Sequence, residues 1–301
     1  MTSSPPTTSD DVQVASRDVP ALVAAGVTVV AWASAFVAIR WVGQSFEPGP
    51  LALGRLLLGS AALGAVLAAR RSWTAPTRRE WLLIGLCGLA WFAVYNLALN
   101  AAEQRVDAGT AAMLVNLGPL LIALLAGALL GEGFPRRLLL GAAVAFTGTV
   151  LIGASTAGSA PADALGVALC LVAAATYAIG VLAQKLVLRR LPALQVTFSA
   201  CLVGAAVCLP FSPALVAQVS RAPTAAIGAL VYLGLVPTAL AFGTWAFALA
   251  RTEAGRLGVS TYLVPLLTVL LAWPLLGEVP PVPALAGGAL ALAGVALSRR
   301  R

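Results

Sequence analysis

Ten long apolar runs constrain this chain more than any other feature of its sequence. An α-helix needs about 20 apolar residues to cross the roughly 30 Å hydrocarbon core of a bilayer. Of the 301 residues, 60% are hydrophobic and only 10% are charged, whereas soluble domains carry about 25% charged residues. The sequence therefore excludes a soluble domain and predicts an all-α integral membrane protein with ten transmembrane helices. The runs lie at approximately 21–43, 49–69, 80–101, 108–130, 136–154, 164–187, 193–211, 224–248, 256–277 and 280–298.

The lysines and arginines cluster between the apolar runs and indicate an orientation. Fifteen of the 19 fall in alternate connecting segments, only Arg105 and Arg221 fall in the others, and Arg40 and Arg55 lie inside runs. Cytoplasmic loops of membrane proteins carry the excess of Lys and Arg. We therefore expect a multi-pass protein of the cytoplasmic (inner) membrane with both termini in the cytoplasm. The net charge of +8 does not indicate nucleic-acid binding, because the basic residues are not gathered on one face.

The amino-terminal segment and the cysteines set further limits. Residues 1–19 are rich in Ser, Thr, Pro and Asp and lack apolar periodicity, which predicts a disordered cytoplasmic tail. The four cysteines lie inside apolar runs, and the chain contains neither a CxxC motif nor a histidine. We expect no metal site, no cofactor and no disulfide framework. The sequence shows no paired acids and no activated Ser or Cys, so no catalytic residue is assigned and no enzyme is expected.

The two halves of the chain repeat each other. Residues 119–132, PLLIALLAGALLGE, match residues 265–278, PLLTVLLAWPLLGE, at 10 of 14 positions with an offset of 146. Each half contains five apolar runs, and an odd number places the second copy upside down in the membrane. This inverted repeat is the architecture of many secondary transporters. The predicted organisation is a five-helix repeat at 20–153, an external linker at 154–163 and a second repeat at 164–298.

Three motifs give the chain a family resemblance. Pro50 is followed by Arg55 in the second run, Gly-Thr-Ala-Ala stands at 109–112, and both halves carry a P…LLGE helix end with downstream glycines. Together with ten helices and a duplicated half, these motifs resemble the EamA-type family of the drug/metabolite transporter superfamily over residues 20–298. The resemblance implies a secondary transporter that exports amino acids, other small metabolites or drugs from the bacterial cytoplasm. The second half has no arginine that matches Arg55.

The expected function is transport of small metabolites, in the first place export of amino acids or related amphipathic compounds. It would proceed by alternating access around a cavity at the membrane midplane. Two alternatives stay open: a drug or cation exporter, and a sensor or scaffold that keeps a transporter fold without transporting. The expected partners are a small-molecule substrate and the lipid bilayer, with the chain as a monomer or homodimer.

Polar and aromatic side chains near the middle of the runs are candidates for the walls of such a cavity. No aromatic belt is expected at this depth, and a buried tyrosine hydroxyl needs a hydrogen-bond partner. The alternative is that these side chains pack helices together, as Asn, Ser and Thr commonly do in membranes. The candidate substrate-binding residues are Trp32, Trp91, Tyr95, Asn96, Asn116, Tyr177 and Tyr262.

Pro119 and Pro265 lie near the middle of the fourth and ninth runs, at matching positions of the two halves. A proline removes the hydrogen bond to the carbonyl four residues earlier, here the carbonyls of Val115 and Thr261. Free carbonyls can line a cavity, and a kinked helix can bend as the cavity changes sides. We expect gating at these two prolines; the alternative is a simple kink that neighbouring helices satisfy.

Charged residues are scarce at membrane depth. Arg55 is a candidate for electrostatic binding of the substrate. The alternative is that it snorkels from its place near the helix start or makes a structural hydrogen bond. No Asp, Glu or His falls at mid-membrane, so a buried carboxylate proton relay is missing. This pattern favours a facilitative mechanism, or coupling through groups that the sequence does not reveal, and a neutral or zwitterionic substrate.

Overall fold

A computed structural model describes residues 18–106, 111, 114–156, 163–276 and 281–298 of this chain. Within these ranges every regular element is a helix and no strand occurs, which confirms the all-helical prediction. The elements of the first half are α1 (Val19–Val42), α2 (Pro48–Arg70), α3 (Arg78–Cys87), η1 (Gly88–Val94), α4 (Tyr95–Ala102), α6 (Leu117–Leu129) and α7 (Arg136–Thr156).

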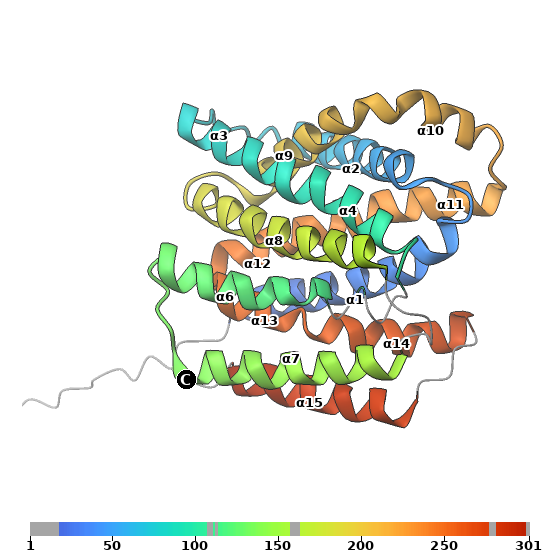
Figure 1. Ribbon diagram of the computed structural model, residues 1–301. Coiled ribbons are helices and arrows are strands. Elements are labelled where there is room, and N and C mark those ends of the chain that lie inside the picture. Colours follow the sequence, from blue (N-terminus) through green and yellow to red (C-terminus); the bar gives the residue numbers. More distant parts are fainter. Residues whose placement is uncertain (1–17, 107–110, 112–113, 157–162, 277–280, 299–301) are drawn as a thin grey trace, which may run out of the picture.

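The second half continues the same side-by-side arrangement of helices (Figure 1). Its elements are α8 (Ala164–Val187), α9 (Ala193–Cys208), η2 (Leu209–Phe211), α10 (Ser212–Val219), α11 (Thr224–Leu233), η3 (Gly234–Leu240), α12 (Ala241–Arg251), α13 (Ala254–Ser260), α14 (Leu263–Leu276) and α15 (Val282–Ser298). The segments η1 and η3 are π-helical.

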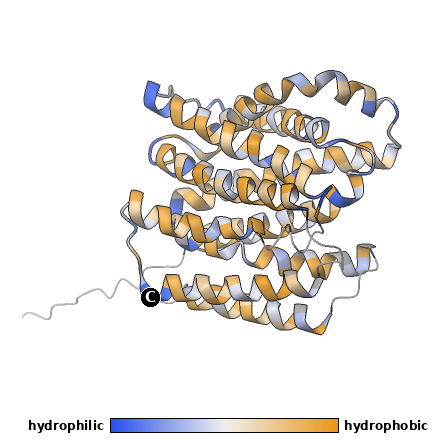
Figure 2. Cartoon of the chain, viewed as in Figure 1, coloured by the Kyte–Doolittle hydropathy of each residue, from blue (hydrophilic) through white to orange (hydrophobic). Residues whose placement is uncertain are grey.

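Seven helical stretches in the described residues are long and apolar enough to cross a membrane, and two shorter apolar helices accompany them. Apolar residues predominate along the helices (Figure 2), and many of the large ones are exposed. Leu82, Leu129 and Val216, for example, are 75%, 69% and 70% exposed. A surface of this kind suits lipid and not water. The chain is therefore a multi-pass membrane protein, while the number of ten crossings stays a prediction.

Short acidic side chains begin the first helix of each half. Asp18 Oδ1 accepts a hydrogen bond from the Ala21 N–H at 3.1 Å at the start of α1. Asp163 Oδ1 accepts one from the Leu165 N–H at 2.8 Å at the start of α8. An aspartate at this position satisfies an N–H group that the helix itself leaves without a partner. These two residues therefore fix where α1 and α8 start.

The helix boundaries repeat along the chain with the offset found in the sequence. The starts of α3 and α11, of α6 and α14, and of α7 and α15 each lie 146 residues apart. The two π-helical segments also begin 146 residues apart, at Gly88 and Gly234, and both span 7 residues. Because π-helices are rare, this coincidence shows that the two halves share one backbone plan.

A polar side chain occupies the widened turn of each π-helical segment. Asn96 Nδ2 donates hydrogen bonds to the carbonyls of Phe92 at 2.9 Å and Trp91 at 3.4 Å. Thr238 Oγ1 donates to the carbonyl of Leu233 at 2.8 Å. A π turn loosens the ladder of backbone hydrogen bonds, and inside a membrane the loosened carbonyls need donors from side chains. Asn96 and Thr238 supply them.

Helices α7 and α15 lie against each other at one edge of the bundle (Figure 1). Their contact depends on glycines. A Cβ atom added at Gly141 would lie 2.6 Å from the carbonyl oxygen of Gly294, and one added at Gly287 would lie 2.6 Å from that of Gly148. Such distances are too short for any side chain, so only glycine lets the two backbones approach this closely.

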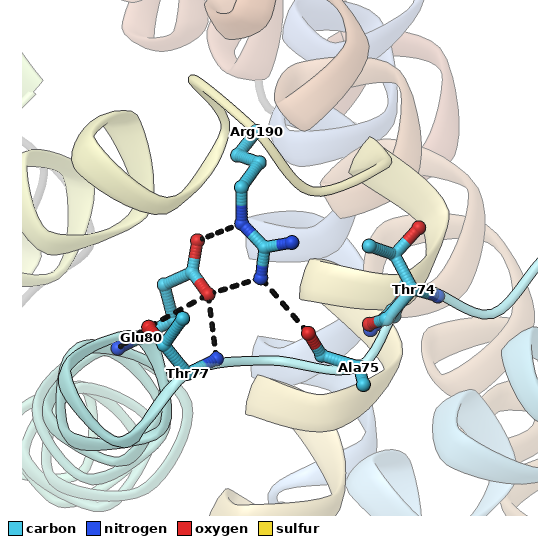
Figure 3. Close-up of polar contacts among 6 residues, drawn as sticks. Thr74, Ala75, Thr77, Glu80 and Arg190 are labelled. Carbon is cyan, nitrogen blue, oxygen red and sulfur yellow. Dashed lines mark hydrogen bonds and ion pairs between the residues drawn. The ribbon is translucent and has the colours of Figure 1, made fainter.

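The segment between α2 and α3 is fastened to the second half of the chain (Figure 3). Arg190, just after α8, forms an ion pair with Glu80 and donates from Nη2 to the carbonyl of Ala75 at 2.9 Å. Gln195 of α9 exchanges two hydrogen bonds with the backbone of Thr74, at 2.9 and 2.6 Å. We call this end of the bundle, where the segments after α2, α8 and α12 meet, the basic end.

Candidate functional site

A cavity lies at mid-helix depth between helices of both halves. Its walls come from α1, α2, η1, α4, α6, α8, α12 and α14. It offers about 60 Å³ to the centres of water-sized molecules. One water needs roughly 10–15 Å³ on this measure, so the space corresponds to about four to six waters. The cavity therefore has room for one small molecule.

Most residues that the sequence nominates for binding meet at this cavity. Trp32, Trp91, Tyr95, Asn96, Asn116 and Tyr177 all line it, together with Arg55 and Pro119. The structure does not bring Tyr262 there. Its side chain is fully buried and packs against Phe146, with ring centroids 6.3 Å apart. Thr261, one residue earlier, occupies the wall instead, so the break before α14 turns Tyr262 away from the cavity. Pro265 also stands outside the lining.

The fourth and ninth apolar runs are interrupted at the cavity wall, shortly before their prolines. Helix α6 begins only at Leu117 and α14 only at Leu263. Val115 and Thr261, whose carbonyls the prolines are expected to free, both line the cavity. The Thr261 carbonyl accepts a hydrogen bond from the Val264 N–H at 2.9 Å, which forms a tight turn. The prolines thus accompany breaks in the helices at matching positions of the two halves.

Aromatic rings close the cavity toward the basic end. The ring of Trp32 lies 5.1 Å from Trp245, 5.5 Å from Phe242 and 6.0 Å from Trp91, measured between centroids. Trp91 in turn lies 5.1 Å from Tyr177. Each such contact contributes roughly 0.5–1.5 kcal/mol beyond burial. Trp91 and Trp245 are each 1% exposed, and Trp245 follows the wall residue Phe242 by one turn toward the basic end. We call these five rings the aromatic floor.

Sequence reasoning misses Phe242 and Trp245. Both belong to the segment AFGTWAF at 241–247, where a spacing of three puts them on one face of a helix. Phe242 is also the counterpart of Asn96 at the offset of 146. The helical spacing and the offset of 146 together could have identified Phe242 and Trp245 from the sequence.

Arg55 is the charged group of the cavity wall. Its side chain is only 5% exposed, so it does not snorkel to the interface. Its Nε has no hydrogen-bond partner within the described part of the chain, and no ion pair there includes Arg55. A buried guanidinium without a partner is costly in a membrane. The arrangement suits an anionic group, above all a carboxylate, which arginine can bind through two parallel hydrogen bonds.

The two asparagines stand at different places in the cavity wall. Asn96 uses its amide nitrogen for the carbonyls of the π turn, as described above. Asn96 therefore stabilises the backbone of the cavity wall. Asn116 is 6% exposed and stands at the break before α6.

A second cavity adjoins the first at the end opposite the basic end. Ile39 of α1 lines both cavities. On α2, Leu51 lines the second cavity one turn before Arg55 in the first. On the helix of α4, Leu99 lines the first cavity, and Glu103 lines the second one turn later. The second cavity offers about 180 Å³ on the same measure. The two therefore follow one another along three helices toward the opposite end.

Contacts between helices close the basic end beneath the aromatic floor. Glu132, after α6, accepts hydrogen bonds from the backbone N–H groups of Ala254 at 2.7 Å and Gly255 at 3.0 Å. Lys185 of α8 donates from Nζ to the carbonyl of Leu249 of α12 at 2.7 Å. The first contact joins the two halves of the chain, and the second joins two helices of the second half.

Comparison with known proteins agrees with this architecture. The sequence profile of the EamA-like transporter family matches residues 19–154 and 164–300. The chain is 39% identical over 274 residues, 91% of each chain, to a probable terminal-alkyne amino-acid exporter of Streptantibioticus cattleyicolor. It is 29% identical over 280 residues, 89% of this chain and 90% of the other, to a probable amino-acid metabolite efflux pump of Salmonella typhimurium. A crystal structure with 23% identity shares the fold, with a TM-score of 0.75 over 93% of this chain and 96% of the other.

Proposed function

Because this chain belongs to the EamA-like transporter family, we propose that it exports amino acids or related amphipathic small molecules across the cytoplasmic membrane. It is a membrane transporter and not an enzyme. The observation that carries the choice of substrate is the buried Arg55, without a partner among the described residues, in the wall of a mostly apolar and aromatic cavity. A carboxylate neutralises that charge, and the rest of a small amphipathic molecule fits against the rings.

The chemistry of the walls divides the substrate into two parts. Arg55 binds the carboxylate, because a guanidinium can hold a carboxylate through two parallel charge-assisted hydrogen bonds. Trp32, Trp91, Tyr95 and Tyr177 contact the apolar side chain of the substrate through their ring faces. Asn116 and Thr261 stand beside the breaks in the two long helices. The names of the two relatives, an amino-acid exporter and an amino-acid metabolite efflux pump, support the same class of substrate.

Transport proceeds by alternating access, with two inverted five-helix repeats and ten membrane crossings. The excess of Lys and Arg supports a cytoplasmic position for the basic end. In the conformation described here the substrate cavity continues into the second cavity, while the aromatic floor and the contacts of Glu132 and Lys185 lie on the cytoplasmic side. This conformation therefore corresponds to the outward-facing state. Loading from the cytoplasm requires that the contacts at the basic end break.

The two alternatives predict different behaviour. A cation exporter needs a negative or neutral cavity, and the buried charge of Arg55 disfavours a cationic substrate. A sensor or scaffold binds without moving its ligand across the membrane, so measured flux separates it from a transporter.

The test is counterflow of labelled amino acids, organic cations and sugars in proteoliposomes. Wild type is compared with Arg55→Gln and Tyr95→Ala. The matched control is Tyr232→Ala, since Tyr232 is 37% exposed on α11 and does not line the cavity. We expect amino-acid counterflow that the control retains. Arg55→Gln should reduce it at least about tenfold, the loss of one charge-assisted hydrogen bond. Tyr95→Ala should reduce it about two- to tenfold, the loss of one aromatic contact. Uptake of cations alone would refute the proposal, and so would binding without flux.

A further inference from the structure

Glu103 is a buried carboxylate beside the pathway between the two cavities. It follows α4 directly, and its N–H donates to the Leu99 carbonyl at 3.0 Å, so it continues the helical stripe of Tyr95 and Leu99. Both carboxylate oxygens are buried and have no hydrogen-bond partner among the described residues. Glu103 lines the second cavity. A carboxylate in this position has capacity for a donor that the protein itself does not provide.

The positive charge that acts most strongly on Glu103 is Arg55 of α2, followed by Arg40 of α1. Yet Arg55 and Glu103 do not form an ion pair, so their nitrogen and oxygen atoms are more than 4.0 Å apart. Each side chain keeps a buried polar atom without a hydrogen bond, Nε on Arg55 and both oxygens on Glu103. Two ionisable groups that can carry opposite charges are thus held close to each other and left unbridged.

We propose that Arg55 and Glu103 form a zwitterion clamp, in which Arg55 binds the α-carboxylate of the substrate and Glu103 binds its α-ammonium group. The inference rests on the proposed function and narrows it to molecules that carry an ammonium group and a carboxylate on the same carbon atom. The apolar side chain of such a substrate points from the clamp into the cavity, toward the aromatic floor. Both unmet hydrogen-bonding groups are then satisfied by one ligand, which is how buried ionised groups are best stabilised.

Other charged and polar groups lie near Glu103, and none of those in the described chain forms a hydrogen bond with its carboxylate. Arg40 lies on α1 and lines the second cavity. Arg105, two residues after Glu103, donates to Asp163 at 2.9 Å before α8. Glu47, at the start of α2, is exposed and lines a separate cavity beside α10. Asn100 donates from Nδ2 to the Pro48 carbonyl at 3.1 Å, which leaves its buried Oδ1 without a partner in the described chain.

The clamp predicts selectivity at both ends of the substrate. An N-acetyl amino acid keeps the carboxylate and loses the ammonium charge, so it forfeits the contact with Glu103. An amino-acid methyl ester keeps the ammonium and loses the carboxylate, so it forfeits the contact with Arg55. A site that binds a charged group in this way rejects the analogue that lacks it, because the buried partner is left without a bond.

The experiment is inhibition of counterflow in proteoliposomes. The labelled probe is L-leucine, or whichever panel amino acid gives the fastest counterflow, and the inhibitors are the same amino acid, its N-acetyl derivative and its methyl ester. For wild type we expect both derivatives to inhibit at least about tenfold more weakly, the cost of one lost charge-assisted hydrogen bond. Glu103→Gln removes the penalty for the N-acetyl derivative and keeps that for the ester, whereas Arg55→Gln does the reverse. Glu47→Gln, the control at an exposed carboxylate, keeps both penalties.

The outcomes separate the inference from the proposed function. Wild-type counterflow of amino acids combined with an unchanged N-acetyl penalty in Glu103→Gln overturns the clamp and leaves amino-acid transport standing. The same change of selectivity in Glu47→Gln also overturns it. Absence of amino-acid counterflow in folded wild type refutes the proposed function, and the clamp with it. If Glu103→Gln does not fold, Glu103→Asp provides the second measurement. It keeps the charge on a shorter side chain, so amino-acid affinity falls while the N-acetyl penalty persists, and loss of that penalty overturns the clamp.

Discussion

The carboxylate of Glu132 lies 2.7 Å from the backbone nitrogen of Ala254, across the boundary between the two halves of the chain. Glu132 follows α6, and Ala254 begins α13. A negative charge at the start of a helix is stabilised by the N–H groups that point toward it. The contact therefore fastens the first half to the second at the basic end.

Glu132→Gln should weaken this attachment. Glutamine keeps one acceptor oxygen and loses the charge, so the expected destabilisation is about 1.5–3 kcal/mol, the range for hydrogen bonds to ionised groups. Thermal unfolding in detergent measures it. Glu253→Gln is the control, since its exposed ion pair with Arg256 should contribute less. An equal loss of stability in both variants would contradict the role given to Glu132.

Glu103 should make stability depend on pH. Burial raises the pKa of Glu103 from an ordinary value of 4.5 to about 8. The folded protein then holds this proton more tightly than the unfolded chain. The contribution of the protonated Glu103 to the free energy of unfolding is therefore fully present below about pH 4 and is lost as the pH rises through 8. Wild type should lose stability relative to Glu103→Gln between about pH 5 and 8, at no more than about 1.4 kcal/mol per pH unit. A difference in thermal stability between the two proteins that stays constant over this pH range would exclude the titration.

The same titration should appear in transport if the clamp operates. An α-ammonium group binds the ionised carboxylate, so substrate and proton compete for Glu103. The apparent affinity for an amino acid should fall as the pH drops below 8, approaching about tenfold per pH unit. Counterflow at pH 6, 7 and 8 measures this slope, and Glu103→Gln should flatten it. A slope that survives the substitution would assign the titration to another group.

The glycines between α7 and α15 should not tolerate even one added methyl group. A Cβ atom at Gly148 would lie 2.6 Å from the backbone nitrogen of Ala291. Gly148→Ala should therefore destabilise the protein by roughly 1–3 kcal/mol, the usual cost of overpacking. Gly228 on α11 has no atom within 4 Å of an added Cβ, so Gly228→Ala should be neutral or stabilising by about 0.4–1 kcal/mol. Thermal unfolding of the two variants in the same detergent tests the contrast.

Gly180 of α8 gives Trp91 its room in the aromatic floor. A Cβ atom at Gly180 would collide with Cβ of Trp91 and lie 3.1 Å from its Cγ. The Trp91 ring is already held by Phe242 at 4.9 Å and Tyr177 at 5.1 Å, so its displacement narrows the cavity. Gly180→Ala should raise the KM for counterflow by about tenfold, the effect of losing roughly 1.4 kcal/mol of binding. Gly85→Ala, with no atom within 4 Å of the new Cβ, should leave the KM unchanged.

Depth in the membrane made much of the cavity predictable. Trp32, Tyr95 and Tyr177 are large aromatic side chains with a polar group, and they lie in the middle of apolar runs. Contact with lipid favours such side chains at the membrane interface and not at this depth. That criterion finds residues at the right depth but does not say which face of the helix they occupy. Tyr262 shows the limit, since a two-residue break before α14 decides its direction.

Glu103 could not be found by the same criterion. Its place in the sequence, just beyond an apolar run, resembles that of an ordinary loop residue. Its burial arises only because α1, α2 and α4 close around the second cavity. The offset of 146 between the halves can be read from the sequence, but the π-helical segments cannot. Their signal is a hydrogen bond from Asn96 or Thr238 to a backbone carbonyl, and this exists only after folding.

The π turn of η1 determines which side chains of its helix line the two cavities. Successive residues of an α-helix are rotated by about 100° around its axis. A deletion of one residue within Gly88–Val94 that restored a regular α-helix would turn every later side chain of that run by this angle. Tyr95 and Leu99 would then leave the first cavity and Glu103 the second. One surplus residue, present at the same place in both halves of the chain, therefore determines which stripe of the helix lines the two cavities.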